Sequence, residues 1–160
     1  MTASFAPDPS IQQIAEAYAL DAVDFAKKSF RVKLDWSDQS VQHVEGILAQ
    51  LHDSLPSAQP DEEAIWSFAK MLGSYVGEVY RKRHSGRWGM VTLNDQTFPG
   101  MQSTSGTNFW PWARAQKRIV NGPEDNMWHY YKVLLEKTAS PMSTTTPPVT
   151  APWWKRIFGG

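Results

Sequence analysis

The stretch Phe68–Tyr80 reads FAKMLGSYVGEVY and belongs to a helical pattern that we expect to run from about residue 61 to residue 83. Its apolar residues recur at helical spacing on one face. Trp66 and Tyr80 widen that face on one side, so the apolar arc exceeds the ~100° of a helix covered on one side only. We therefore predict that this is the central helix of the fold. Its main apolar positions are Ile65, Phe68, Ala69, Leu72, Val76 and Val79.

Two glycines, Gly73 and Gly77, lie inside this predicted helix. Each costs about 1 kcal/mol relative to alanine in a helix interior. Close approach of a neighbouring backbone would offset that cost, so we expect the helix to meet another backbone there. The cations at residues 81–83 suit the negative end of a helix, and Gly86 stops it.

Two further amphipathic helices are predicted on the N-terminal side. Ser10 is expected to cap the first, over about residues 10–29, whose apolar stripe is Ile11, Ile14, Tyr18, Ala22 and Phe25. Ser37 or Asp38 is expected to cap the second, which should end near Leu55. Residues 30–36 alternate apolar and polar and predict a short extended segment. Residues 56–60 begin and end with proline and predict a loop.

The C-terminal half predicts a hairpin followed by two helices. Residues 87–93 should form a strand, Asn94-Asp95 a turn, and residues 97–98 or 101–104 the return strand. Asn108 is expected to cap a helix that ends at Asn121-Gly122, and Pro123 to begin a last helix. The sequence therefore predicts a single α+β domain over residues 1–137, mostly helical, with about five helices and a small antiparallel β-hairpin.

Beyond this domain, residues 138–152 contain four prolines and no charged residue, which predicts a flexible linker. The tail over residues 153–160 combines four large apolar side chains with two cations. On a nascent helix, its apolar residues share one face. Such a segment can fold back onto its own domain, dock on a protein partner, or make weak contact with an anionic membrane.

Composition excludes several classes of protein. The chain has no cysteine, so disulfides, thiol catalysis and thiolate metal sites are excluded. It has no apolar run long enough to span a membrane, and residues 1–10 do not resemble a secretory signal. We therefore expect a cytoplasmic protein.

The net charge of zero conceals a division between the two halves of the chain. Residues 1–80 carry five basic and twelve acidic side chains, whereas residues 81–160 carry eleven and four. Internal complementarity between the halves is one interpretation, and two faces for different partners is the other.

No catalytic, cofactor-binding or metal site is predicted. Asp125 and His129 stand four residues apart, but a metal needs three or four converging ligands. Glu78 is the one candidate for paired-carboxylate chemistry. It lies away from the apolar stripe of its helix, and the alternative is a surface glutamate paired to Arg81 or Lys82.

Seven cations between residues 81 and 118 include only Asp95 as an acidic interruption, and three tryptophans interleave with them. A stacking platform for nucleic acid would need this combination. However, the sequence pI of about 6.9 is far below that of a dedicated nucleic-acid binder. We therefore rank nucleic acid below a protein partner. The cations are Arg81, Lys82, Arg83, Arg87, Arg114, Lys117 and Arg118, and the tryptophans are Trp88, Trp110 and Trp112.

Three motifs together resemble a group of small bacterial proteins of unknown function. They are the LGSYVGEV core of the central helix, the Gly86–Gly89 sequence GRWG, and the NGPED sequence that ends at Asp125. The resemblance also takes in Leu34–Ser37, covers about residues 34–136, and implies a bacterial origin and an α+β domain but no activity. By analogy alone, such domains are sometimes immunity or adaptor proteins beside secreted toxins.

We therefore expect a non-enzymatic protein-binding or adaptor module, without a cofactor, that carries a tethered recognition tail. Three alternatives stay open: an immunity-type protein that neutralises a toxin, a nucleic-acid binder through residues 81–118, and an enzyme with Glu78 as general base. The candidate binding residues are Trp153, Trp154, Lys155, Arg156, Ile157, Phe158, Arg81, Arg83, Arg87, Trp88 and Glu78.

Overall fold

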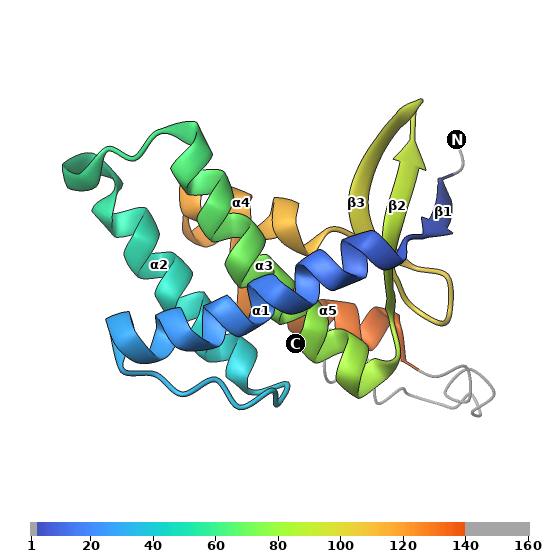
Figure 1. Cartoon of the computed structure of the whole chain (residues 1–160), viewed down its shortest axis with the longest axis horizontal. Coiled ribbons are helices and arrows are strands. Elements are labelled where there is room, and N and C mark those ends of the chain that lie inside the picture. Colours follow the sequence, from blue (N-terminus) through green and yellow to red (C-terminus); the bar gives the residue numbers. More distant parts are fainter. Residues whose placement is uncertain (1–2, 140–160) are drawn as a thin grey trace, which may run out of the picture.

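A computed structural model describes residues 3–139, which form five α-helices, one 3-10 turn and a four-stranded antiparallel sheet (Figure 1). The predicted α+β class and helical majority are confirmed. The elements are β1 Ser4–Pro7, α1 Pro9–Phe30, α2 Ser40–Ala58, α3 Glu62–His84, β2 Arg87–Leu93, β3 Gln96–Gln102, β4 Asn108–Phe109, α4 Pro111–Asn121, the 3-10 turn Pro123–Asp125, and α5 Met127–Lys137.

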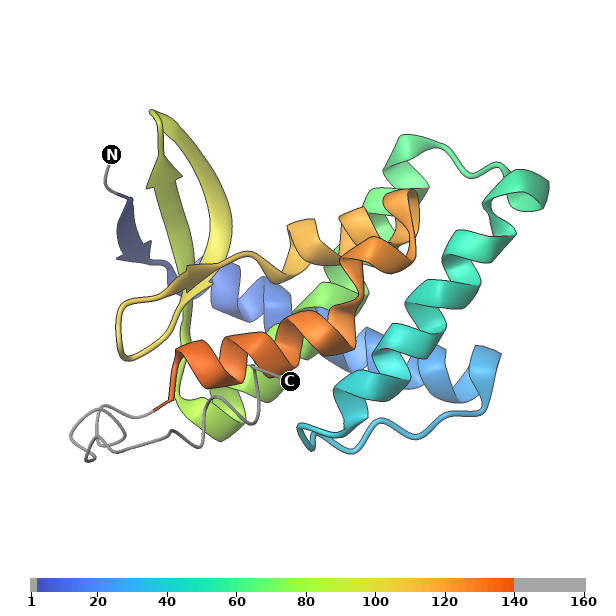
Figure 2. The same cartoon turned by 180° about the vertical axis from the view of Figure 1, so that it is seen from behind.

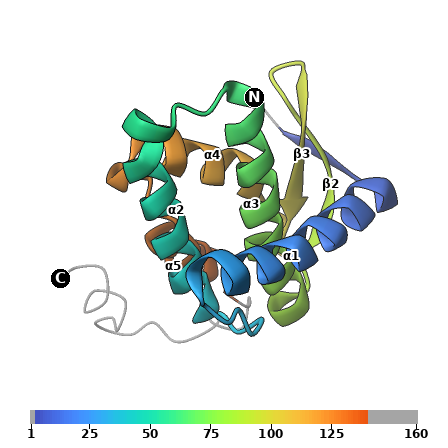
Figure 3. The same cartoon turned by 60° about the vertical axis from the view of Figure 1, so that its left-hand side comes forward.

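Helix α3 is the central element, as its wide apolar arc predicts. Every residue from Leu72 to Tyr80 is buried. Helix α1 crosses α3 on one side (Figure 1), and α4 and α5 lie on the other (Figure 2). Helix α2 packs against α4 and α5. The sheet lies on the opposite side of α3 from α2 (Figure 3). A helix surrounded in this way has no solvent face along its middle turns.

The buried face of α1 differs from the predicted stripe. Four alanines at helical spacing are fully buried, whereas Ile14 is 43% exposed. Small side chains let α1 approach α3 closely, so they displace the larger residues to the edge of the contact. The buried alanines are Ala15, Ala19, Ala22 and Ala26.

The two glycines of α3 both stand at close contacts. A Cβ at Gly73 would lie 2.6 Å from the carbonyl oxygen of Pro111, so the predicted approach of another backbone is confirmed there. A Cβ at Gly77 would overlap the ring of Trp88. The neighbour of Gly77 is therefore a side chain, and the prediction of a backbone was wrong at this position.

The β2–β3 hairpin forms where the sequence predicts it. Asn94 and Asp95 both have positive φ, 54° and 65°, as a two-residue turn of this hand requires. The return strand β3 is continuous from Gln96 to Gln102. The sequence did not predict β1 and β4, which extend the sheet to the order β1-β2-β3-β4. The two residues of β4 are too few to show a period-two pattern, and β1 ends in a proline, which argues against a strand.

Helix ends differ from the prediction at several positions. Asp8 caps α1 in place of Ser10, because its carboxylate accepts hydrogen bonds from the backbone N–H groups of Ser10 and Ile11. Helix α2 continues to Ala58 with Pro56 in its last turn, so the predicted loop begins later.

The boundaries near the C-terminal helices also move. Asn108 belongs to β4 and does not cap α4, which begins at Pro111. Pro123 begins a 3-10 turn, and Asn126 caps α5 by accepting from the backbone N–H of His129 at 2.8 Å.

Acidic side chains of the N-terminal half pair with basic side chains of the C-terminal half, two of the three pairs at partly exposed positions. Glu16 pairs with Arg81 at 3.4 Å, Asp38 with His84 at 3.0 Å, and Glu45 with Arg118 at 2.8 Å. Each pair joins an acidic residue of the N-terminal half to a basic residue of the C-terminal half. These contacts support internal complementarity. Across residues 3–139, no helix has the length and apolar composition to cross a bilayer.

Candidate binding pocket

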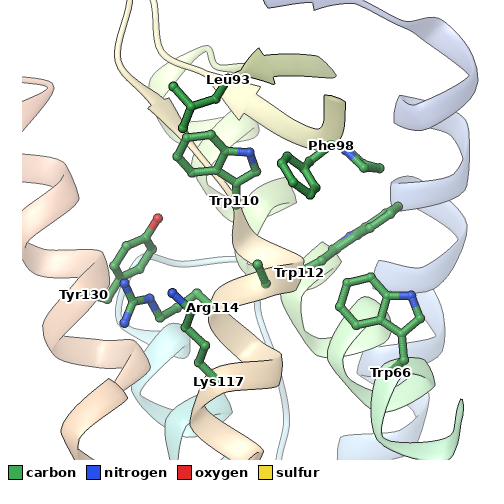
Figure 4. Close-up of a pocket in the computed structure, with 10 residues that line it drawn as sticks. Trp66, Leu93, Phe98, Trp110, Trp112, Arg114, Lys117 and Tyr130 are labelled. Carbon is green, nitrogen blue, oxygen red and sulfur yellow. The ribbon is translucent and has the colours of Figure 1, made fainter. Parts of the chain in front are cut away.

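An aromatic pocket with a volume of about 320 Å³ opens between the β2–β3 hairpin and helices α3, α4 and α5 (Figure 4). Tyr130 and Arg114 stand on one side of it and Trp66 on the other (Figure 4). Phe98, which belongs to the hairpin, and Trp110 lie between these two sides (Figure 4). Its lining is mostly apolar, and its two charged residues are the cations Arg114 and Lys117.

The segment Trp110-Pro111-Trp112 builds one wall of the pocket. Pro111 stands at the first position of α4, where its missing N–H has no intrahelical partner to lose. Trp112 points into the core and donates from Nε1 to the Ser74 hydroxyl at 2.7 Å. Trp112 also packs edge-on against Trp66. The pocket wall is therefore anchored to α3 through Trp112.

Trp110 is held differently from Trp112. Its Nε1 atom is buried and has no hydrogen-bond partner within residues 3–139. Gly100 leaves room for the ring, because a Cβ there would lie 2.9 Å from Trp110 Cδ1. A buried donor without an acceptor costs about 1–3 kcal/mol. Apolar packing alone therefore fixes the indole of Trp110 in the pocket wall.

The two cations of the pocket have different surroundings. Arg114 donates from Nη1 to Asp125 at 2.8 Å, and its guanidinium carbon lies 4.4 Å from the ring centre of Tyr130. Burial raises the pKa of Tyr130, and the charge of Arg114 offsets part of that rise. Lys117 is exposed and makes no salt bridge within the described part of the chain. Lys117 therefore carries the positive charge available to a ligand.

Glu78 is not the surface residue that its helical position predicts, because its side chain is 1% exposed. Its Oε2 accepts from Arg81 Nε at 2.7 Å and from Trp88 Nε1 at 2.9 Å, and Oε1 accepts from Arg81 Nη2 at 2.8 Å. This bidentate contact raises the pKa of Arg81. The predicted pairing with Arg81 is confirmed, and the predicted exposure was wrong because α3 is covered on all sides. Glu78 thus joins α3 to β2.

The predicted basic cluster is divided among separate contacts. Arg81, Arg114 and Arg118 are each paired with a carboxylate. Arg83 donates to the carbonyl of Trp36 at 3.0 Å, and Arg87 donates to the side chain of Gln102 at 2.9 Å.

The alternative of a nucleic-acid stacking platform is not supported by two of its three tryptophans. Trp88 and Trp112 are buried in the core, where no base can stack on them. Trp110 keeps partial exposure, but as a wall of the pocket. Among the candidate residues, Trp88 and Glu78 therefore contact each other inside the protein, and Arg83 and Arg87 stay exposed on it.

Asp125 and the histidines do not form a metal site in the described part of the chain. Asp125 accepts from Arg114 and from Asn121, and it lies in the 3-10 turn before α5, whereas His129 lies in α5. His84 contacts Asp38, which also accepts from the Tyr131 hydroxyl at 2.6 Å. No group of three His, Asp or Glu side chains converges within residues 3–139.

Glu45 is a partly buried charge whose role the sequence did not indicate. Its two oxygens accept from Arg118 Nε at 2.8 Å and from the backbone N–H of Met127 at 2.7 Å, which ties α2 to α4 and α5. No sequence signal marks this role. The tail candidates lie outside the described residues. They are Trp153, Trp154, Lys155, Arg156, Ile157 and Phe158.

Comparisons of the chain with protein-family models, with curated proteins and with solved structures each return no match.

Proposed function

We propose that this chain is a protein-binding module and that the aromatic pocket is its binding site. The observation that carries the proposal is the pocket itself, a concave apolar site of about 320 Å³ with cations in its lining. This volume is near the lower end of ligand sites, at about 300 Å³. A single large side chain is an occupant of suitable size.

The composition of the pocket supports a protein partner. Energetically dominant residues of protein interfaces are enriched in tryptophan, tyrosine and arginine and insert into well-packed pockets. Trp66, Trp110, Tyr130 and Arg114 supply these residue types around one cavity. Tryptophan and tyrosine rings also lose little conformational entropy on binding.

The surroundings of Glu78 support a structural role over general-base catalysis. A general base must reach a substrate proton, whereas this carboxylate is buried and accepts three hydrogen bonds from Arg81 and Trp88. The chain as an adaptor and the chain as an immunity-type protein differ only in the identity of the partner. Cytoplasmic localisation, which the sequence predicts, remains part of this proposal.

A photo-crosslinker at position 98 tests the proposal. Phe98 is 44% exposed and lines the pocket, and p-benzoylphenylalanine is a close replacement for it. We expect a protein adduct from position 98 in cells that encode this chain. The same amino acid at Leu20, which is 64% exposed on α1, is the control and should give no such adduct.

Mass spectrometry of the adduct decides between the alternatives. An adduct to another protein would support the proposed function. If that protein is a toxin, the immunity interpretation is favoured over the adaptor interpretation. Adducts to nucleic acid, or equal adducts from both positions, would contradict the proposed function.

A further inference from the structure

We infer that the occupant of the aromatic pocket is an acidic peptide segment of the partner, with one large apolar side chain flanked by carboxylates. This inference rests on the proposed function and specifies the chemistry of the partner at the same site. It combines three observations: the shape of the pocket, the sign of its charges, and the different anchoring of its tryptophans.

The pocket has an apolar interior for one side chain. Phe98 and Trp66 approach it from the hairpin and from α3, and Tyr130 approaches it from α5 (Figure 4). Trp110 immediately precedes α4 and also lines the pocket. Aromatic pairs prefer offset or edge-to-face contacts at 4.5–7 Å between ring centroids. Rings on several sides of one cavity offer such contacts to an inserted phenylalanine, tryptophan or leucine.

The charges that line the pocket determine which partner residues are favourable on either side of the inserted side chain. Among the described residues that line it, the charged ones are both cations. Arg114 is already neutralised by Asp125 at 2.8 Å, whereas Lys117 makes no salt bridge within residues 3–139. A carboxylate next to the inserted side chain can therefore pair with Lys117, and a neighbouring cation would be repelled.

The charge argument also disfavours the tail of this chain as the occupant. Trp153 and Trp154 have suitable size, but Lys155 and Arg156 follow them directly. Insertion of the tail would place these cations beside Lys117, which is unpaired within the described residues. Like charges brought together at an interface disfavour the complex, so a partner of opposite charge is preferred.

The two tryptophans of the pocket wall are anchored differently, which makes one of them a useful reporter. Trp112 is fixed by its hydrogen bond to Ser74, but Trp110 has no hydrogen bond to break within the described residues. The Trp110 ring lines the pocket, so a side chain that enters contacts it directly. Its indole N–H is a local reporter of that event.

The experiment uses the full chain and three blocked pentapeptides, DDFEE, SSFSS and KKFKK. Calorimetry gives the affinities, and ¹⁵N spectra follow the indole N–H signals of the eight tryptophans, with Trp110→Phe assigning the signal of interest. We expect DDFEE to bind about tenfold more tightly than SSFSS at low salt and to lose this advantage as salt screens the charges. The Trp110 signal should shift on binding.

Two variants and a matched control localise the effect. Lys117→Glu should weaken DDFEE by about tenfold and strengthen KKFKK, because the charge at the pocket is reversed. Phe98→Ala should weaken both DDFEE and SSFSS, since it removes a wall of the pocket. Lys132→Glu makes the same charge change on α5, outside the pocket lining, and should change affinity by less than about twofold.

The outcomes separate this inference from the proposed function. Equal binding of DDFEE and SSFSS, or equal effects of Lys117→Glu and Lys132→Glu, would overturn the acidic segment. If no peptide binds while position 98 still forms a protein adduct, the acidic segment is overturned. The proposed function is unaffected by that outcome. Tight binding of KKFKK to the unaltered chain would favour the tail as the occupant and would also overturn the inference.

Discussion

The indole of Trp88 donates a hydrogen bond to Glu78 Oε2 at 2.9 Å inside the protein, where both side chains are almost fully buried. The same carboxylate receives two hydrogen bonds from Arg81, so α3 and β2 share one charged contact. A buried carboxylate is tolerated only when it is paired and hydrogen-bonded. This relationship makes Glu78 a stability determinant of the fold.

Glu78→Gln should lower the free energy of unfolding by about 2 kcal/mol or more, because it leaves the Arg81 guanidinium without its bidentate acceptor. Urea denaturation measures the change. Glu16 also contacts Arg81, at 3.4 Å, but it is partly exposed, so Glu16→Gln is the matched control and should cost at most about 1 kcal/mol. Equal losses in the two variants would refute this role of Glu78.

Gly73→Ala should destabilise the protein although alanine is the better helix former. The added Cβ would lie 2.6 Å from the Pro111 carbonyl, and a backbone atom cannot move aside as a flexible side chain can. Gly46→Ala on α2 is the matched control. No atom lies within 4 Å of its Cβ position, so this variant should gain up to about 1 kcal/mol.

Gly77→Leu should be more harmful still, by several kcal/mol, because the side chain would displace Trp88 and Met101. Thermal melting checks the substitution. An equal or higher melting temperature than that of the unaltered chain would show that α3 has room at this position.

Stability should fall at alkaline pH because burial raises the pKa of four of the five tyrosines, Tyr75, Tyr80, Tyr130 and Tyr131. The pKa of a buried tyrosine is higher in the folded chain than in the unfolded chain, where it is about 10. The free energy of unfolding is therefore unaffected below about pH 10 and falls as the pH rises from there through the folded-state pKa. Tyrosinate absorbance at about pH 10.5 should therefore be lower for the folded chain than for the same chain in urea. Equal absorbance would contradict the prediction.

Deletion of residues 153–160 should leave the melting temperature unchanged and impair association. We expect association to weaken because each of the two tail tryptophans can bury about 150–250 Å² on a partner. Crosslinking from position 98 and liposome binding measure the two possible contacts. A lower melting temperature with unchanged association would show instead that the tail covers its own domain.

Nucleic-acid binding should not exceed the weak non-specific level at physiological salt. Three of the seven cations between residues 81 and 118 are paired with carboxylates inside the protein. Binding to single-stranded and duplex DNA and RNA, measured at several salt concentrations, checks this expectation. A salt-dependent complex well below micromolar that Arg83→Ala and Arg87→Ala abolish would reverse the ranking of partners.

The sequence by itself determined the features that depend on local patterns. The wide apolar arc of residues 61–83 identified the central helix, and Asn94-Asp95 marked the hairpin turn. The helical cost of Gly73 indicated a close backbone contact. Each of these follows from helical or strand period, turn chemistry or backbone entropy, which neighbouring residues impose on one another.

Only the tertiary structure decided which residues lie inside and which side chains meet. The burial of Glu78 depends on α1 and β2 covering a face of α3 that its own sequence marks as polar. The alanine face of α1 is buried because it fits closely against α3. The pocket brings together Trp66, Phe98 and Tyr130 from three elements with Trp110, which immediately precedes α4. Contacts between residues so far apart in the chain depend on how helices and strands pack, and no local period encodes that packing.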